Sequence, residues 1–276
     1  MRNEPWRAGL SLTCTAAALL LWLWQGDYLA LAAIGYVPIV IVRVATGNAE
    51  GLVGSSLWSW EVIRSFSVVL GGLALLYVGA RSWPARRLTS RLTTRQLHRA
   101  SLVLVGTAVA VPVGYAVTRL AWALGIPLGI TDAFLTELRP IVYHGLGLAL
   151  MALGGAVLTV GLLRPWGEVF PHRMPVLGGR RVPIRFAVSW ALAVSVLVMV
   201  AGLFFVRAVL TDSGLVGAPS GADQQLAAWL PEMFWPIWSL ALAGAALCYR
   251  ERRTRAESSS AAEVTESDRR SHRVAG

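Results

Sequence analysis

The sequence of 276 residues contains no lysine, 2 cysteines and 4 histidines, and only 14% of its residues are charged. Soluble globular domains carry about 25% charged residues, so an ordinary soluble domain is excluded. The two cysteines, Cys14 and Cys248, cannot build a disulfide scaffold, and the long apolar runs exclude a disordered chain. So few histidines and cysteines offer no zinc or haem ligand spacing, and we therefore expect no bound metal.

In place of charge the sequence has long apolar runs, and 55% of its residues are hydrophobic. A helix needs about 20 apolar residues to cross the hydrocarbon core of a bilayer. Runs of this kind cover 62–80, 100–118, 140–163, 186–206 and 231–249, and a longer one lies within 8–42. The pattern predicts an all-α, polytopic transmembrane helical bundle, with the lipid bilayer as its surroundings.

The apolar region 8–42 decides whether the bundle has six or seven spans. A helix of that length would be about 50 Å long, more than a single straight span needs. Because Gln25-Gly26-Asp27 is typical of a break, we favour two helices, 8–25 and 29–43, and therefore seven spans.

Two other interpretations of this N-terminal region stay open. Arg2 and Arg7 favour a cytoplasmic N-terminus, which fits six spans with one long or broken first helix. A cleaved signal peptide is the third option, because Ala30-Leu31-Ala32 resembles a cleavage site after an apolar stretch.

All 25 basic residues are arginine, and they gather in alternate loops. Loops 81–99 and 164–185 and the segment after the last span are rich in arginine, whereas loops 44–60, 120–138 and 211–230 contain acids and no basic residue. This is the positive-inside pattern of a multi-pass protein in the cell (cytoplasmic) membrane, with the arginine loops and the C-terminus in the cytoplasm. Because the arginines are confined to short loops, we expect no nucleic acid partner.

The chain divides by composition into a transmembrane domain, 1–250, and a polar tail, 251–276. The tail consists largely of Arg, Glu, Ser and Ala without aromatic residues. Such a segment buries too little apolar surface to offset its ordering entropy, so we predict a disordered cytoplasmic tail.

The arginines also mark a repeat. Three times an apolar helix ends at an arginine, an acidic loop follows, and a return helix ends at another arginine: Arg43 to Arg81, Arg119 to Arg164, and Arg207 to Arg250. Repeated helical hairpins indicate duplication, which is common among transporters, although any hairpin that obeys membrane rules would look similar.

Charged residues within or beside the spans are the candidate site residues, because a charge in a membrane must face protein or water. Glu61 and Arg64 share a helix face after Trp58-Ser59-Trp60 and could anchor a substrate or form an interfacial pair. Asp27 is the one acid in the long N-terminal apolar region, and in the seven-span interpretation it is a turn residue.

A second candidate set consists of arginines near the predicted outer surface. Arg43, Arg119 and Arg207, with Arg64, could bind an anionic substrate in an outward vestibule. Alternatively they pair with Asp132, Glu137 and Asp212, or reach the headgroups individually by snorkelling.

Two resemblances bear on function. The hairpin from Arg164-Pro165-Trp166-Gly167 to Gly179-Arg180-Arg181 and the closing Leu230-Pro231-Glu232-Met233-Phe234-Trp235-Pro236 resemble uncharacterised polytopic membrane proteins of high-GC bacteria. That resemblance spans about the C-terminal two-thirds and implies no activity. More weakly, Trp60-Glu61, the chain length and a second acid are similar to integral-membrane terpene cyclases. This likeness implies an enzyme with Glu61 as the acid that starts cyclisation and Asp27 as its partner.

The sequence therefore supports three functional hypotheses. The first is small-molecule transport or export, or the membrane subunit of a transporter. The second is a membrane-embedded enzyme acting on a prenyl or lipid substrate through Glu61 and Asp27. The third is a non-catalytic scaffold or immunity protein. Nucleotide-binding and hydrolase motifs are absent from the sequence, so we expect no cofactor, and an ATP-driven role would need a separate ATPase or biosynthetic partner.

Overall fold

The protein is described by a computed structural model over residues 5–47, 59–82, 92–170, 172, 178–211 and 225–274. The side chains at 5, 38–39, 42–43 and 82 and beyond 259 lie outside the described structure. Helices make up almost all of this structure, and an isolated antiparallel bridge joins Val169 and Arg181.

The long helices are α1 (Pro5–Gln25), α4 (Trp60–Ser82), α6 (Thr94–Ala123), α8 (Val142–Gly161), α9 (Ile184–Leu210) and α11 (Trp235–Val274). The short ones are α2 (Leu29–Gly35), α3 (Val37–Ala45), α7 (Asp132–Leu138), α10 (Leu226–Met233) and the 3-10 turn η2 (Pro165–Gly167). Within the described ranges, 6 helical segments are long and apolar enough to cross a membrane, the last of them running from α10 into α11. This confirms the all-α helical bundle and indicates a multi-pass membrane protein.

The N-terminal region breaks where the sequence predicts, after Gln25, but the predicted second span, 29–43, is not a single helix. The predicted helix 29–43 is divided at Tyr36 into α2, of 7 residues, and α3, of 9 residues. At about 1.5 Å per residue neither reaches across a hydrocarbon core of about 30 Å. Pro38 has no N–H to donate to the carbonyl of Ile34, which explains why the helix does not continue unchanged past Tyr36.

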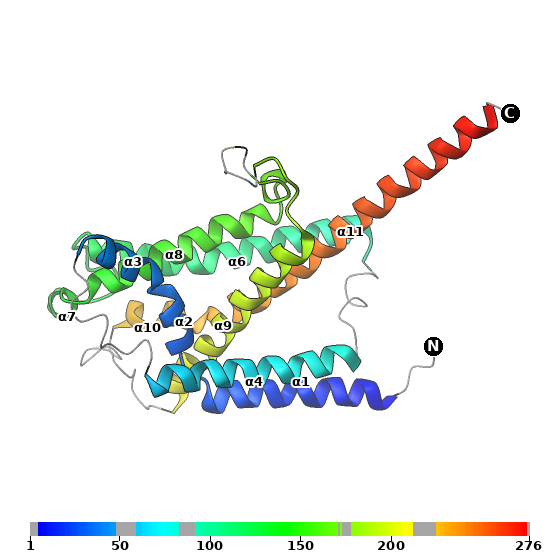
Figure 1. Ribbon diagram of the computed structural model, residues 1–276. Coiled ribbons are helices and arrows are strands. Elements are labelled where there is room, and N and C mark those ends of the chain that lie inside the picture. The colour runs from blue at the N-terminus through cyan, green and yellow to red at the C-terminus, as the bar shows by residue number, and fades with distance from the viewer. Residues whose placement is uncertain are drawn as a thin grey trace.

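The spans pack as three antiparallel helical hairpins, α1 with α4, α6 with α8, and α9 with α11 (Figure 1). The second and third are the hairpins expected from the arginine repeat. In the first, α4 packs on α1, and α2 and α3 are inserted between them in the chain. These two short helices cross one end of the bundle, where α2 touches α4, α8 and α9.

The breaks and the arginine-rich turns lie at opposite ends of the bundle. The α1–α2 break, α7 and α10 share one end, whereas the start of α6, the end of α8 and the start of α9 share the other (Figure 1). Arg95, Arg99, Arg164 and Arg185 belong to this second end. We call the first end the break end; that it faces the outside, and that the C-terminus is cytoplasmic, stay predictions from the arginine distribution.

Helix α11 continues beyond the bundle as a helix to Val274, where the sequence predicts a disordered tail (Figure 1). Local pairs support this helix: Arg255 binds Glu251 at 2.8 Å, and Arg253 lies 3.8 Å from Glu257. Pairs four residues apart stabilise a helix only slightly, so disorder of the free tail in solution stays a prediction.

Packing between α1 and α4 depends on a glycine. The indole of Trp22 is 2% exposed, and its Nε1 donates to the carbonyl of Val68 at 3.2 Å. A Cβ at Gly72 would overlap the six-membered and five-membered rings of this indole. The absence of a side chain at Gly72 therefore sets how closely α4 approaches α1.

We expect Gly72→Ala to lower the free energy of unfolding by about 1–3 kcal/mol, because overpacking forces the indole or the helix to move. Thermal unfolding of the purified protein in detergent measures this. Gly154→Ala is the matched control, since an added Cβ at Gly154 meets no atom within 4 Å. Equal melting temperatures for the two variants would contradict the packing role of Gly72.

Candidate functional site: two charged helix breaks

The first candidate site lies at the break between α1 and α2 and is centred on Asp27. Asp27 is 8% exposed. Its Oδ1 accepts hydrogen bonds from the Leu29 N–H at 3.0 Å and the Ser65 hydroxyl at 2.5 Å, and its Oδ2 accepts one from Arg64 at 2.9 Å. Both oxygens of the buried carboxylate therefore have donors.

Asp27 and Ser65 together cap the start of α2. The Ser65 hydroxyl donates to Asp27 and accepts from the Ala30 N–H at 3.0 Å. A negative charge beside the first N–H groups of a helix also interacts favourably with the helix dipole. Ser65 and Arg64 belong to α4, so α4 fixes the position at which α2 begins.

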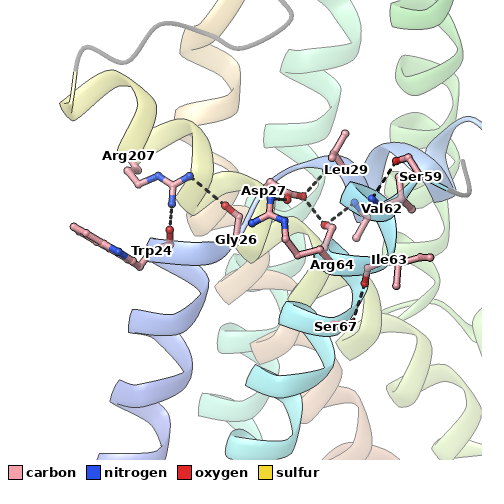
Figure 2. Close-up of polar contacts among 12 residues, drawn as sticks. Trp24, Gly26, Asp27, Leu29, Ser59, Val62, Ile63, Arg64, Ser67 and Arg207 are labelled. Atoms are coloured by element: carbon pink, nitrogen blue, oxygen red, sulfur yellow. Dashed lines mark hydrogen bonds and ion pairs between the residues drawn. The ribbon is translucent and has the colours of Figure 1, made fainter. Parts of the chain in front are cut away.

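The end of α1 is capped by a cation from a third helix. Arg207 on α9 donates to the carbonyl groups of Leu23, at 2.8 Å, of Trp24, and of Gly26, at 3.3 Å. Figure 2 shows Arg207 reaching Trp24 and Gly26 while Arg64 points at Asp27 from the other side. The last carbonyls of a helix have no partner within it and attract positive charge.

At the first break, the carbonyls at the end of α1 and the N–H groups at the start of α2 thus both have side-chain partners. We interpret this break as a structural anchor. Burial, together with the neighbouring Asp27 carboxylate, raises the pKa of the Tyr28 hydroxyl, so Tyr28 adds no charge to the cluster. The Tyr28 ring packs against Phe204 and Phe205 of α9, with centroid distances of 5.4 and 6.0 Å.

The second candidate site lies at the break between α10 and α11, also at the break end. Glu232, 4% exposed, forms an ion pair with Arg119 of α6, which is 9% exposed. Pro231 and Pro236 flank the break, and neither has an N–H to continue a helical hydrogen-bond ladder. The pair therefore connects the interrupted last span to α6.

Arg119 has several partners besides Glu232. It donates to the carbonyls of Ala227, at 3.2 Å, and Ala228, at 3.3 Å. Its guanidinium carbon also lies 4.7 Å from the Tyr115 ring centroid and 4.2 Å from that of Trp122. Carbonyl oxygens and aromatic faces both stabilise a cation, so Arg119 is held even apart from Glu232.

Glu232 is less completely satisfied than Arg119. Its Oε2 is buried without a hydrogen-bond partner among the described residues. The indole N–H groups of Trp235 and Trp238, which follow directly on α11, are also buried and unpartnered there. Buried polar atoms are normally hydrogen-bonded. The group of buried polar atoms without described partners therefore distinguishes the second break from the first.

The structure places the predicted site residues in separate clusters. Glu61 is exposed on the first turn of α4 and makes no described contact with Asp27, and Arg64 pairs with Asp27. Arg119 and Arg207 contact different helices, Arg119 pairing with Glu232 and not with an acid of the loops. The Arg43 side chain and Asp212 lie outside the described residues. The described contacts therefore form neither the expected Glu61 and Asp27 site nor one vestibule of arginines.

Glu232 is the site residue that the sequence analysis did not select. It lies one residue inside the predicted span 231–249, where it resembles an interfacial acid. The signal that could have found it is an acid between two prolines, Pro231 and Pro236, in an otherwise apolar run. Its pairing with Arg119, 113 residues earlier, could not be predicted from spacing alone.

Comparison of the chain with protein-family profiles, with curated proteins and with solved structures finds no match.

We expect Asp27→Ala to lower the free energy of unfolding by about 3 kcal/mol, because it leaves Arg64, Ser65 and the start of α2 without their acceptor. Arg64→Gln should cost less, since the Arg64 side chain is 43% exposed. Chemical unfolding in detergent gives both values. Glu61→Gln is the control, because Glu61 is an exposed acid on α4, the helix that carries Arg64. A loss of stability in Glu61→Gln as large as that in Asp27→Ala would contradict this interpretation.

Proposed function

We propose that the protein transports a small molecule across the cytoplasmic membrane. We further propose that the Arg119–Glu232 pair closes the transport path at the break end of the bundle. The observation that carries this proposal is the buried ion pair at the interruption of the last span. Interrupted spans with charged residues at the break are typical of transporter binding and gating sites. Two such interruptions share one end of this bundle.

The ion pair is suited to act as a gate because it joins two separable elements. Helix α10 holds Glu232 and supplies two carbonyls to Arg119, whereas Arg119 belongs to the continuous helix α6. The break at Phe234 lets α10 change its angle to α11 without unwinding either helix. Separation of the pair would release the end of α10 beside the break from α6, while the carbonyls of Ala227 and Ala228 hold its start.

The source of energy is constrained by the sequence. Nucleotide-binding motifs are absent from it, so transport would be driven by an ion gradient or by a separate ATPase subunit. If the arginine-rich turns are cytoplasmic, the Arg119–Glu232 gate faces the outside, as export requires at its final step.

The enzyme alternative is less well supported. It needs Glu61 and Asp27 at one substrate site, but Glu61 is exposed and Asp27 is fully engaged by Leu29, Arg64 and Ser65. A non-catalytic scaffold is the competing hypothesis, and it differs from a transporter in needing no opening at the break end.

Accessibility of a cysteine behind the gate tests the proposal without knowledge of the substrate. Ala108 is completely buried on α6, about 16 Å from Arg119 along the helix. The variant Ala108→Cys, with Cys14 and Cys248 replaced by alanine, carries one thiol, which we call the reporter thiol. We expect the reporter thiol to resist a membrane-impermeant maleimide applied to intact cells. Adding Arg119→Gln together with Glu232→Gln should open the gate and allow labelling.

Arg64→Gln is the matched control, because it removes an ion pair at the other break and should leave the reporter thiol protected. Protection of this thiol in all variants, with unchanged folding, would favour the scaffold hypothesis. Labelling only in inside-out vesicles would place the break end in the cytoplasm and reverse the proposed direction.

A further inference from the structure

The two helix breaks differ in how their carboxylates are satisfied. Asp27 has three hydrogen-bond donors shared over both oxygens. Glu232 has its described donor, Arg119, on Oε1, and Oε2 has none among the described residues. Glu232 therefore has a carboxylate oxygen without a described hydrogen bond, to which a proton can bind, whereas both oxygens of Asp27 already accept hydrogen bonds.

The surroundings of Arg119 make a neutral Glu232 tolerable. If Glu232 took up a proton, Arg119 would keep the carbonyls of Ala227 and Ala228 and the faces of Tyr115 and Trp122. The cation would thus stay solvated by protein groups. Loss of the charge on Glu232 would weaken the contact between α6 and the end of α10 beside the break, whereas the carbonyls of Ala227 and Ala228 would still hold the start of α10.

Few other ionisable groups face Glu232. Helix α6 presents Arg119 and Tyr115. On α9, the ionisable residues are Arg185, at its far end, and Arg207, which is bound to the carbonyls of α1. On α11 the first ionisable side chains after Trp235 are Cys248 and Tyr249, almost four turns beyond. Arg119 is therefore the charged group described in contact with Glu232.

We propose that Glu232 is the proton-binding site of the transport cycle, an inference that rests on the proposed transport function. A proton from the water at the break end binds Oε2 and converts the carboxylate to a neutral carboxylic acid. The ion pair with Arg119 is lost, the end of α10 beside the break moves away from α6 and the gate opens. Release of the proton restores the carboxylate and closes the gate, so the proton gradient drives the cycle.

Infrared difference spectroscopy of the full chain in lipid nanodiscs tests proton binding directly. Between alkaline and acid pH, we expect the wild-type spectrum to contain the C=O band of one buried carboxylic acid. This band should be lost in Glu232→Gln and kept in Glu61→Gln. Should Glu232→Gln fold poorly, the double variant with Arg119→Gln, which leaves no unpaired charge, provides the same comparison. A buried-acid band that survives in these variants would overturn the proposal.

Labelling of the reporter thiol separates this proposal from the transport function. We expect the thiol to be labelled only at acid pH when Arg119 and Glu232 are intact, and at every pH with Glu232→Gln, which mimics the protonated side chain. If the Arg119 and Glu232 double variant exposes the thiol but acid does not, transport stands and the proton site is refuted. If Glu232 titrates and the thiol is never labelled, the transport function fails, and the role of the proton in a cycle fails with it.

Discussion

Every main-chain N–H and C=O group inside a bilayer needs a partner within the protein, and this requirement explains the arrangement of charges in this structure. A continuous helix meets it alone, but a broken one leaves donors and acceptors that lipid cannot satisfy. Here α1 is interrupted after Gln25 and the last span at Phe234. At each interruption arginines from other helices bind the exposed carbonyls or the acid beside them.

The same chemistry gives two different results at the two breaks. Arg207 and the Asp27 cluster satisfy both sides of the α1–α2 break and tie α1, α2, α4 and α9 together. At the α10–α11 break, Arg119 is well satisfied but Glu232 is only partly so. A fully bonded network resists change, whereas a partly bonded buried carboxylate is the natural place for a switch between two states. The first break thus holds the bundle together, and the second is the one at which we propose that the bundle moves.

Composition and hydropathy were sufficient to predict the helical membrane fold, the break after Gln25 and the positions of the long spans, because burial in lipid strongly restricts sequence. They were insufficient to count the spans, since a run such as 29–43 is apolar enough to cross but is divided at Tyr36. The site was predicted only in part. Asp27, Arg64, Arg119 and Arg207 were selected as charges in costly places, but their partners depend on which helices pack together. Glu232 was missed because an acid at a span boundary looks like an interfacial residue until α10 and α6 are seen in contact.

The central claim is that Arg119 and Glu232 stabilise the break end through their mutual interaction and not as two independent side chains. A double-mutant cycle of Arg119→Gln and Glu232→Gln, measured as free energies of unfolding in detergent, tests it most directly. The account predicts that the double variant loses about 2 kcal/mol less free energy of unfolding than the two single variants lose together. Additive effects, within about 0.5 kcal/mol, would show that the two side chains act separately and would contradict the account.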